Sequence, residues 1–130
     1  MGRKKSHNLT EGELPVMQVM WARNRATVGD VVAALPSHPP LAYSTVLTTL
    51  RILEAKGYLR HTKEGRAFVY EPLVVQEEAS RKALEHLVKR FFGGSRELLV
   101  MNLLKEETIR PAELRRIKKM IAESEQGGKR

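Results

Sequence analysis

The chain has 130 residues, and its formal net charge is +8 at pH 7. This length suits one small domain with a helical appendage, and it excludes two large independent cores. The absence of cysteine excludes disulfides, thiolate zinc sites, iron–sulfur clusters and cysteine nucleophiles.

The composition also bears on partners and location. The positive charge favours a polyanionic partner, and nucleic acid is the usual one. The four histidines, His7, His38, His61 and His86, are far apart in the sequence, so we expect no metal ion and no other cofactor. No apolar run approaches the roughly 20 residues that cross a bilayer, and none follows the basic start as a signal peptide would. We therefore expect a cytoplasmic protein without membrane insertion.

Two capping boxes predict two short helices near the start of the chain. In residues 10–13 (Thr-Glu-Gly-Glu), a threonine precedes a glutamate by three positions, and apolar residues follow at helical spacing. This pattern predicts a first helix that ends near Arg23. Residues 27–30 (Thr-Val-Gly-Asp) predict a second helix, which Pro36 ends.

A third helix and a hairpin follow. After a loop over residues 36–40, residues 43–56 carry apolar side chains on one face, and Gly57 ends the helix. Residues 58–70 favour two strands around a turn at residues 64–66. Three helices, with a tight connection between the second and the third, are the pattern of a helix-turn-helix, and the basic hairpin after them predicts a wing.

The rest of the chain predicts three more helices, over residues 75–92, 95–105 and 111–123. Each has a wide apolar face, and three short helices cannot bury such faces fully against one another, so we expect a homodimer. The fold class is mainly α with a small β-hairpin wing: a winged-helix DNA-binding domain at residues 1–73 and a helical dimerisation domain at residues 74–130. The side chains that we expect in the dimer contact are Leu84, Leu87, Val88, Phe91, Leu98, Leu99, Leu103, Leu114, Ile117 and Ile121.

The third helix is the expected recognition helix, which places side chains near its N-terminus against base edges in the major groove. With the apolar face turned inward, the residues that we expect at DNA are Tyr43, Ser44, Thr45, Leu47, Thr48 and Arg51. Hydroxyl groups bond to several base edges, Leu47 can meet a thymine methyl group, and Arg51 can reach phosphate or guanine. The alternative is that these are ordinary exposed helix residues, and for Tyr43 that it is half-buried core.

The hairpin carries basic residues where a wing would meet the sugar–phosphate backbone or a minor groove. The residues that we expect there are Arg60, His61, Lys63 and Arg66. A solvated turn with ordinary basic side chains is the alternative interpretation.

Several short motifs also occur in a defined order along the chain. They are Leu9-Thr10-x-x-Glu13, Met17-x-x-Met20-Trp21, Thr27-Val28-x-Asp30-Val31, residues 43–50 (YSTVLTTL), Leu53-x-x-Lys56-Gly57 and Gly65-Arg66-x-x-x-Tyr70. Together with residues 92–94 and 99–103, they resemble the penicillinase-repressor family (BlaI/MecI/CopY) over nearly the whole chain.

The resemblance implies a homodimeric winged-helix repressor with a three-helix dimerisation segment and a pseudo-palindromic double-stranded DNA operator. In the beta-lactam branch of the family, a membrane sensor protease system triggers cleavage after an asparagine that precedes an apolar residue. Asn102-Leu103 occupies this place, with leucine where well-known members carry phenylalanine. A local hydrogen bond of the asparagine is the alternative role. The copper-responsive branch carries C-terminal cysteines, which are absent here, so copper sensing through thiolates is excluded.

We therefore expect a sequence-specific repressor that leaves its operator when the dimerisation segment is destabilised or cleaved. The alternative function is a winged-helix adaptor that binds protein or RNA without operator specificity. An enzyme is not expected, because the sequence has no nucleophile elbow, no phosphate-binding glycine loop and no paired metal-ligand motif.

Overall fold

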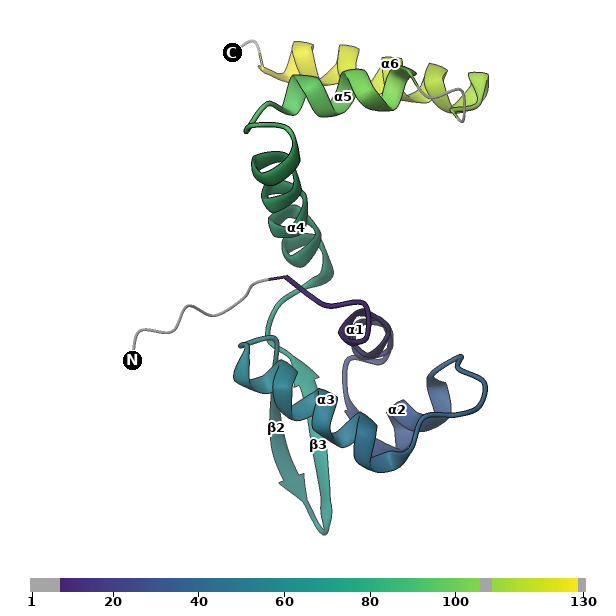
Figure 1. Cartoon of the computed structure of the whole chain (residues 1–130), viewed down its shortest axis with the longest axis vertical. Coiled ribbons are helices and arrows are strands. Elements are labelled where there is room, and N and C mark those ends of the chain that lie inside the picture. The colour runs from purple at the N-terminus through teal and green to yellow at the C-terminus, as the bar shows by residue number, and fades with distance from the viewer. Residues whose placement is uncertain (1–7, 106–108, 129–130) are drawn as a thin grey trace. The chain divides into compact units, whose positions relative to one another are not determined.

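The structure, a computed structural model, describes residues 8–105 and 109–128 (Figure 1). The elements are α1 (Glu13–Arg23), β1 (Ala26–Thr27), α2 (Val28–Ala34), α3 (Tyr43–Ala55), β2 (Leu59–Glu64), β3 (Ala67–Pro72), α4 (Gln76–Phe91), α5 (Arg96–Lys105) and α6 (Pro111–Gly128). They form two compact units, of which the first ends at His86 and the second begins at Leu87. Within the described ranges, no helix is both long and apolar enough to cross a membrane.

Both predicted capping boxes are present. The Thr10 hydroxyl accepts a hydrogen bond from the backbone N–H of Glu13 (3.1 Å), and the Glu13 carboxylate accepts one from the backbone N–H of Thr10 (3.0 Å). The same reciprocal pair joins Thr27 and Asp30, at 3.1 and 3.0 Å. These bonds satisfy backbone donors that the first turn of a helix leaves without a partner. The start of α2 is therefore as predicted, whereas α1 begins at Glu13, with Gly12 at its N-cap position and a turn over residues 11–12 between Thr10 and the helix.

The third helix lies where it was predicted, but its connection to α2 is longer than a tight turn. Residues 35–42 join the two helices, and three of them are prolines, which disfavour continuation of a helix. The side chains of Val46, Leu50 and Leu53 in α3 are all fully buried. Gly57 follows the C-terminal cap residue of α3 and has a φ of +91°, a left-handed conformation that glycine adopts without steric cost.

The hairpin is as predicted, and it belongs to a three-stranded antiparallel sheet with the order β1-β3-β2. His61 of β2 lies opposite Tyr70 of β3, and Gly65 begins the two-residue connection with a φ of +64°. Strand β1 is only two residues long and was not predicted from the sequence. A strand this short shows no alternation of polar and apolar residues, so periodicity cannot reveal it.

One hydrophobic core holds the first unit together. Its fully or nearly fully buried members come from α1, α2, α3, the α3–β2 connection, the sheet and the first turn of α4: Val16, Met17, Met20, Ala26, Val28, Val31, Val46, Leu50, Leu53, Tyr58, Leu59, Tyr70 and Ala79. The indole N–H of Trp21 donates to the carbonyl oxygen of Val74 (2.8 Å), which fixes the segment between β3 and α4 against α1. The first unit therefore continues past residue 73, where the sequence analysis placed the domain boundary.

The second unit contains the end of α4 together with α5 and α6. Gly93 and Gly94, with φ of +57° and +84°, end α4, and the hydroxyl of Ser95 accepts a hydrogen bond from Leu98 N (3.1 Å) at the start of α5. Helix α6 continues to Gly128 rather than ending at residue 123, because no glycine or proline occurs between Pro111 and Gly127.

Candidate nucleic-acid interface

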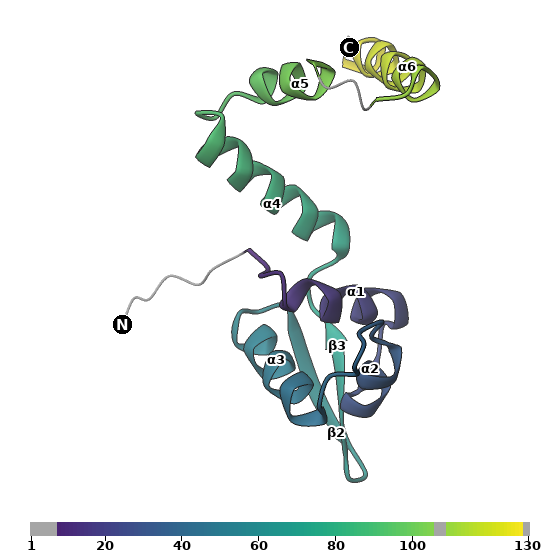
Figure 2. The ribbon, with the colours of Figure 1, turned by 45° about the vertical axis from the view of Figure 1, so that its right-hand side comes forward.

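Helix α3 lies beside the β2–β3 hairpin (Figures 1 and 2), and a stripe of polar side chains on α3 is exposed to solvent. Ser44, Thr48 and Arg51 are exposed and follow one another at helical spacing. Exposed Thr45 flanks this stripe, and Tyr43 at the start of the helix is 58% exposed, so Tyr43 is not part of the core. The arrangement presents hydroxyl and guanidinium groups outward, as a recognition helix requires.

Two apolar residues of α3 border the polar stripe. Leu47 is half-buried and packs against the core, so only part of its side chain faces outward. Ile52 is 43% exposed on the outer surface of the helix, and the sequence analysis did not name it as a site residue. Its neighbours Arg51 and Leu53 were placed correctly by the 3.6-residue period, which also places position 52 on the outer face.

A buried ion pair fixes the C-terminal end of α3. The Lys56 ammonium nitrogen lies 2.7 and 3.0 Å from the two carboxylate oxygens of Glu13, and both side chains are largely buried. The Glu13 carboxylate also accepts the capping bond from Thr10 N. The pair therefore joins the end of α3 to the start of α1. It could not be predicted from a sequence motif, because the two partners are far apart in the chain.

The four basic residues of the wing do not form one cluster. Successive side chains of a strand point to opposite faces of the sheet. Arg60 therefore lies on one face of the hairpin, and His61 and Lys63 lie on the other. Arg60 lies opposite Glu71 and forms an ion pair with it, with 2.6 Å between Nη2 and Oε2. The guanidinium charge of Arg60 is therefore partly neutralised within the protein.

His61 is held by three neighbours. Its Nδ1 lies 2.8 and 2.9 Å from the two carboxylate oxygens of Glu54 in α3. Its ring packs edge-on against Phe68, with 5.1 Å between ring centroids, and lies 5.4 Å from the ring of Tyr70. The imidazole therefore connects the recognition helix to both strands of the wing.

Tyr70 lies beneath this contact, and the charges around it shift the pKa of its hydroxyl. Burial raises the pKa of its hydroxyl above the ordinary value of 10.0, and the nearby Glu54 carboxylate raises it further. The Arg51 guanidinium lowers the same pKa, through its charge and through a hydrogen bond to the Tyr70 hydroxyl. Arg51, Glu54 and Tyr70 therefore lie close together at the junction of α3 and the wing.

The tip of the hairpin carries the exposed wing cations. Arg66 is exposed in the turn, and the ammonium group of Lys63 lies 6.0 Å from the centre of the Phe68 ring. Glu64 also lies near the tip, and it forms an ion pair with Arg25. Arg25, which was not among the predicted site residues, neutralises the acidic residue at this end of the hairpin.

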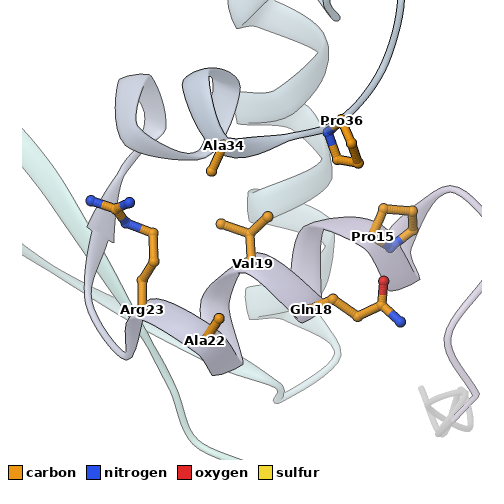
Figure 3. Close-up of a pocket in the computed structure, with 7 residues that line it drawn as sticks. All are labelled: Pro15, Gln18, Val19, Ala22, Arg23, Ala34 and Pro36. Carbon is orange, nitrogen blue, oxygen red and sulfur yellow. The ribbon is translucent and has the colours of Figure 1, made fainter.

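A surface hollow of about 300 Å³ lies between α1 and the end of α2, away from the proposed DNA-contacting residues. Figure 3 shows Val19 of α1 and Ala34 of α2 pointing toward one another across it, with Pro15 and Pro36 at one side. None of the residues that we expect at DNA lines this hollow. Within residues 8–105 and 109–128, no group of three or more histidine, aspartate or glutamate side chains is arranged to hold a metal ion.

The apolar residues predicted for the dimer contact are mostly exposed in the single chain. Leu84, Leu87, Phe91, Leu98, Leu103 and Ile121 are between 38% and 65% exposed, and Leu99, Leu114 and Ile117 are half-buried. Val88 differs from them because only 5% of it is exposed, so it has little surface left for a partner. Asn102 is exposed within α5, and its amide donates to the carbonyl oxygen of Leu98 (2.9 Å), the local bond that was one of its two expected roles.

Comparisons with known proteins agree over nearly the whole chain. A family model described as penicillinase repressor matches residues 9–123. The penicillinase repressor of Bacillus licheniformis is 28% identical over 120 residues, which cover 92% of this chain and 94% of that protein. The methicillin resistance regulatory protein MecI of Staphylococcus aureus (strain N315) is 20% identical over 90% of this chain and 95% of its own length. The solution structure of the DNA-binding domain of the repressor BlaI is 34% identical with a TM-score of 0.50, over 58% of this chain and 93% of that one.

Proposed function

The chain belongs to the penicillinase repressor family, and from this premise we propose that it acts as a homodimer whose two α3 helices bind the two halves of one operator. Its resemblance to BlaI and MecI is confirmed, and it is a DNA-binding transcriptional repressor rather than an enzyme. The predicted winged helix-turn-helix with C-terminal helices is confirmed as well.

The observation that carries the proposal is the exposed stripe of α3. Ser44, Thr48 and Arg51 lie on the face of the helix that the core does not cover, and the flanking Thr45 widens this face. Hydroxyl groups and a guanidinium group are the side-chain groups that bond to base edges in the major groove. We assign base contacts to this stripe, contact with a thymine methyl group to the outer part of Leu47, and a contact at the start of the helix to the exposed Tyr43.

The wing supplies contacts that depend on charge rather than on base sequence. Lys63 and Arg66 lie toward the tip of the hairpin, with no carboxylate partner among the described residues, and their charges are available to phosphates. Arg60 makes a weaker contribution, because Glu71 neutralises part of its charge. Phosphate contacts of this kind fix the position of α3 in the groove.

Dimerisation is supported by the apolar surface of the second unit. Phe91 and Ile121 are 65% and 52% exposed, and Leu98 and Leu103 are about equally open to solvent. Monomeric proteins rarely leave many large apolar side chains exposed in so short a segment. A second copy of the chain would cover them, and linking two half-site contacts raises the affinity because the second contact forms at a high effective concentration.

Release from DNA follows from loss of the dimer. Cleavage of the Asn102–Leu103 bond by a sensor protease system is one route to release, since it separates Leu103 and the whole of α6 from the rest of the protein. The bond lies inside α5, so this helix must unwind locally before a protease can hold an extended segment. The protein acts where it meets chromosomal DNA, in the cytoplasm.

A gel-shift titration against the region upstream of the protein's own gene, with unrelated duplex as competitor, tests the proposal. We expect a shift that the unrelated duplex does not remove, and sedimentation should give two chains per complex. Equal binding to both duplexes, lost at modest salt, would leave only the charge-dependent contacts and favour an adaptor without operator specificity.

A further inference from the structure

The junction of α3 and the wing contains a carboxylate next to the arginine that we assign to DNA. Glu54 lies three positions after Arg51 in the same helix, a spacing at which opposite charges pair on a helix surface. Such a pair would hold the guanidinium against the helix and away from the groove. In the described part of the structure, however, the carboxylate does not pair with Arg51 and bonds instead to Nδ1 of His61.

We propose that His61 is a positioning residue for DNA binding: by holding the Glu54 carboxylate, it keeps this carboxylate from pairing with Arg51. The Arg51 guanidinium bonds to the Tyr70 hydroxyl, and its other N–H donors then remain available to DNA. This inference rests on the proposed function, and it gives His61 a different role from the phosphate contact that the sequence suggested.

The geometry of His61 supports this role. Both carboxylate oxygens of Glu54 lie within 2.9 Å of Nδ1, so the nitrogen that faces α3 is engaged by the carboxylate. The Phe68 and Tyr70 rings support the imidazole ring from the neighbouring strand. Because both rings contact the imidazole, they restrict its rotation and keep Nδ1 directed at Glu54 of α3.

The charges around the junction support the same conclusion. Glu54 and Arg51 are the charged groups that α3 brings to this place: Glu54 raises the pKa of the Tyr70 hydroxyl, and Arg51 lowers it through its charge and a hydrogen bond to that hydroxyl. Lys63 is the neighbouring cation on the face of β2 that carries His61, and it lies over Phe68 rather than at Glu54. His61 is therefore the group that the described structure places on this carboxylate.

The expected effect is modest and measurable. A helix-surface pair of Arg and Glu would occupy Arg51 for only part of the time, so we expect loss of His61 to weaken binding about two- to threefold per half-site. In a dimer that uses both half-sites, the factor applies twice, which gives about four- to ninefold.

A double-mutant cycle in the full chain tests the proposal. The probe is the duplex that the wild-type protein selects from a random-sequence pool, and each affinity is divided by that for a scrambled duplex. We expect His61→Ala to lower this affinity ratio about four- to ninefold. Glu54→Gln should change the ratio less than twofold. The double variant should return to within about twofold of wild type, because no carboxylate remains to pair with Arg51.

His61→Asn provides an independent check. The side-chain amide of the asparagine would place an N–H donor near the position of Nδ1, and this amide carries no charge at any pH. It should keep the affinity ratio within about twofold of wild type. The control is Glu85→Gln, which removes an equal charge from an exposed α4 pair with Arg81 and should leave the ratio unchanged.

Two results would overturn the inference. If the double variant binds as weakly as His61→Ala, and His61→Asn is equally weak, the imidazole contacts DNA itself. An unchanged ratio in His61→Ala would show that Glu54 does not pair with Arg51. A wild-type protein that selects no sequence would instead remove the proposed function, and this inference with it.

Discussion

The Lys56 ammonium group and the Glu13 carboxylate, 2.7 Å apart, join the end of the recognition helix to the start of the first helix. Their side chains are only 18% and 9% exposed, so each charge depends on the other for solvation. The position of α3 in the first unit therefore rests on this polar contact as well as on the apolar core.

Lys56→Met should destabilise the protein, because it leaves the Glu13 carboxylate buried without a counter-charge. We expect the free energy of unfolding to fall by about 1–3 kcal/mol, less than for a fully buried pair, because Lys56 is partly exposed. Urea denaturation followed by circular dichroism measures the change. The matched control is Lys82→Met, in an exposed pair with Glu78, where a loss above about 1 kcal/mol would contradict the importance of burial.

Asp30 should make stability depend on pH in the acid range. Hydrogen bonds from the backbone and side chain of Thr27 hold the pKa of its carboxyl below the ordinary value of 3.8. Because the folded state binds the proton less tightly, the stabilisation is present above the unfolded pKa and is lost as the pH falls through the lower, folded pKa. Thermal unfolding of wild type and Asp30→Asn between about pH 5 and pH 2 measures this. Equal slopes for the two proteins would contradict it.

Arg51→Ala should reduce the preference for the operator over unrelated duplex. A well-placed base contact contributes about 1–3 kcal/mol of discrimination, so the ratio of the two dissociation constants should fall at least about fivefold. Thr49→Ala is the control within the same helix, because the Thr49 hydroxyl bonds to the carbonyl oxygen of Thr45 and does not belong to the outer stripe. Fluorescence anisotropy gives both constants, and an equal loss in the two variants would exclude a special role for Arg51.

The wing cations should affect the salt dependence of binding rather than its selectivity. Each of Lys63→Ala and Arg66→Ala should reduce the slope of log K against log salt by about 1 per half-site. Arg60→Ala should reduce it less, since Glu71 already neutralises part of that charge. Titrations at four salt concentrations measure the slope. A larger change for Arg60 than for Lys63 would show that the Arg60–Glu71 pair opens on DNA.

A chain that stops after Asn102 should be a folded monomer with weak operator binding. It keeps the whole core of the first unit and loses Leu103, Leu114, Ile117 and Ile121. We expect the apparent affinity to fall by about 10²-fold or more, because the two half-site contacts are no longer linked. Sedimentation fixes the mass, and undiminished affinity would contradict release through loss of the dimer.

The sequence predicted features that depend on residues close together in the chain. The capping boxes at Thr10 and Thr27 need only a spacing of three residues, and the inward face of α3 needs only a helical period. Contacts between distant residues could not be predicted in this way. The pairing of Arg60 with Glu71 depends on strand register, and that of His61 with Glu54 depends on how the wing packs against α3.

The second unit shows the same limit. Its apolar faces were visible in the sequence, but the burial of Val88 could not be distinguished from the exposure of Leu84 or Leu87, since all three belong to one apolar stripe. The surface that a partner covers is a property of the fold and not of the stripe alone.

A hydroxyl-radical footprint of the full protein on the DNA upstream of its own gene tests the central claim most directly. We predict two protected segments related by two-fold symmetry, with centres separated by a multiple of about 10 base pairs, because each subunit would place α3 in a major groove on the same side of the duplex. Protection of a single segment, or uniform weak protection along the whole duplex, would contradict a dimer that binds two halves of an operator.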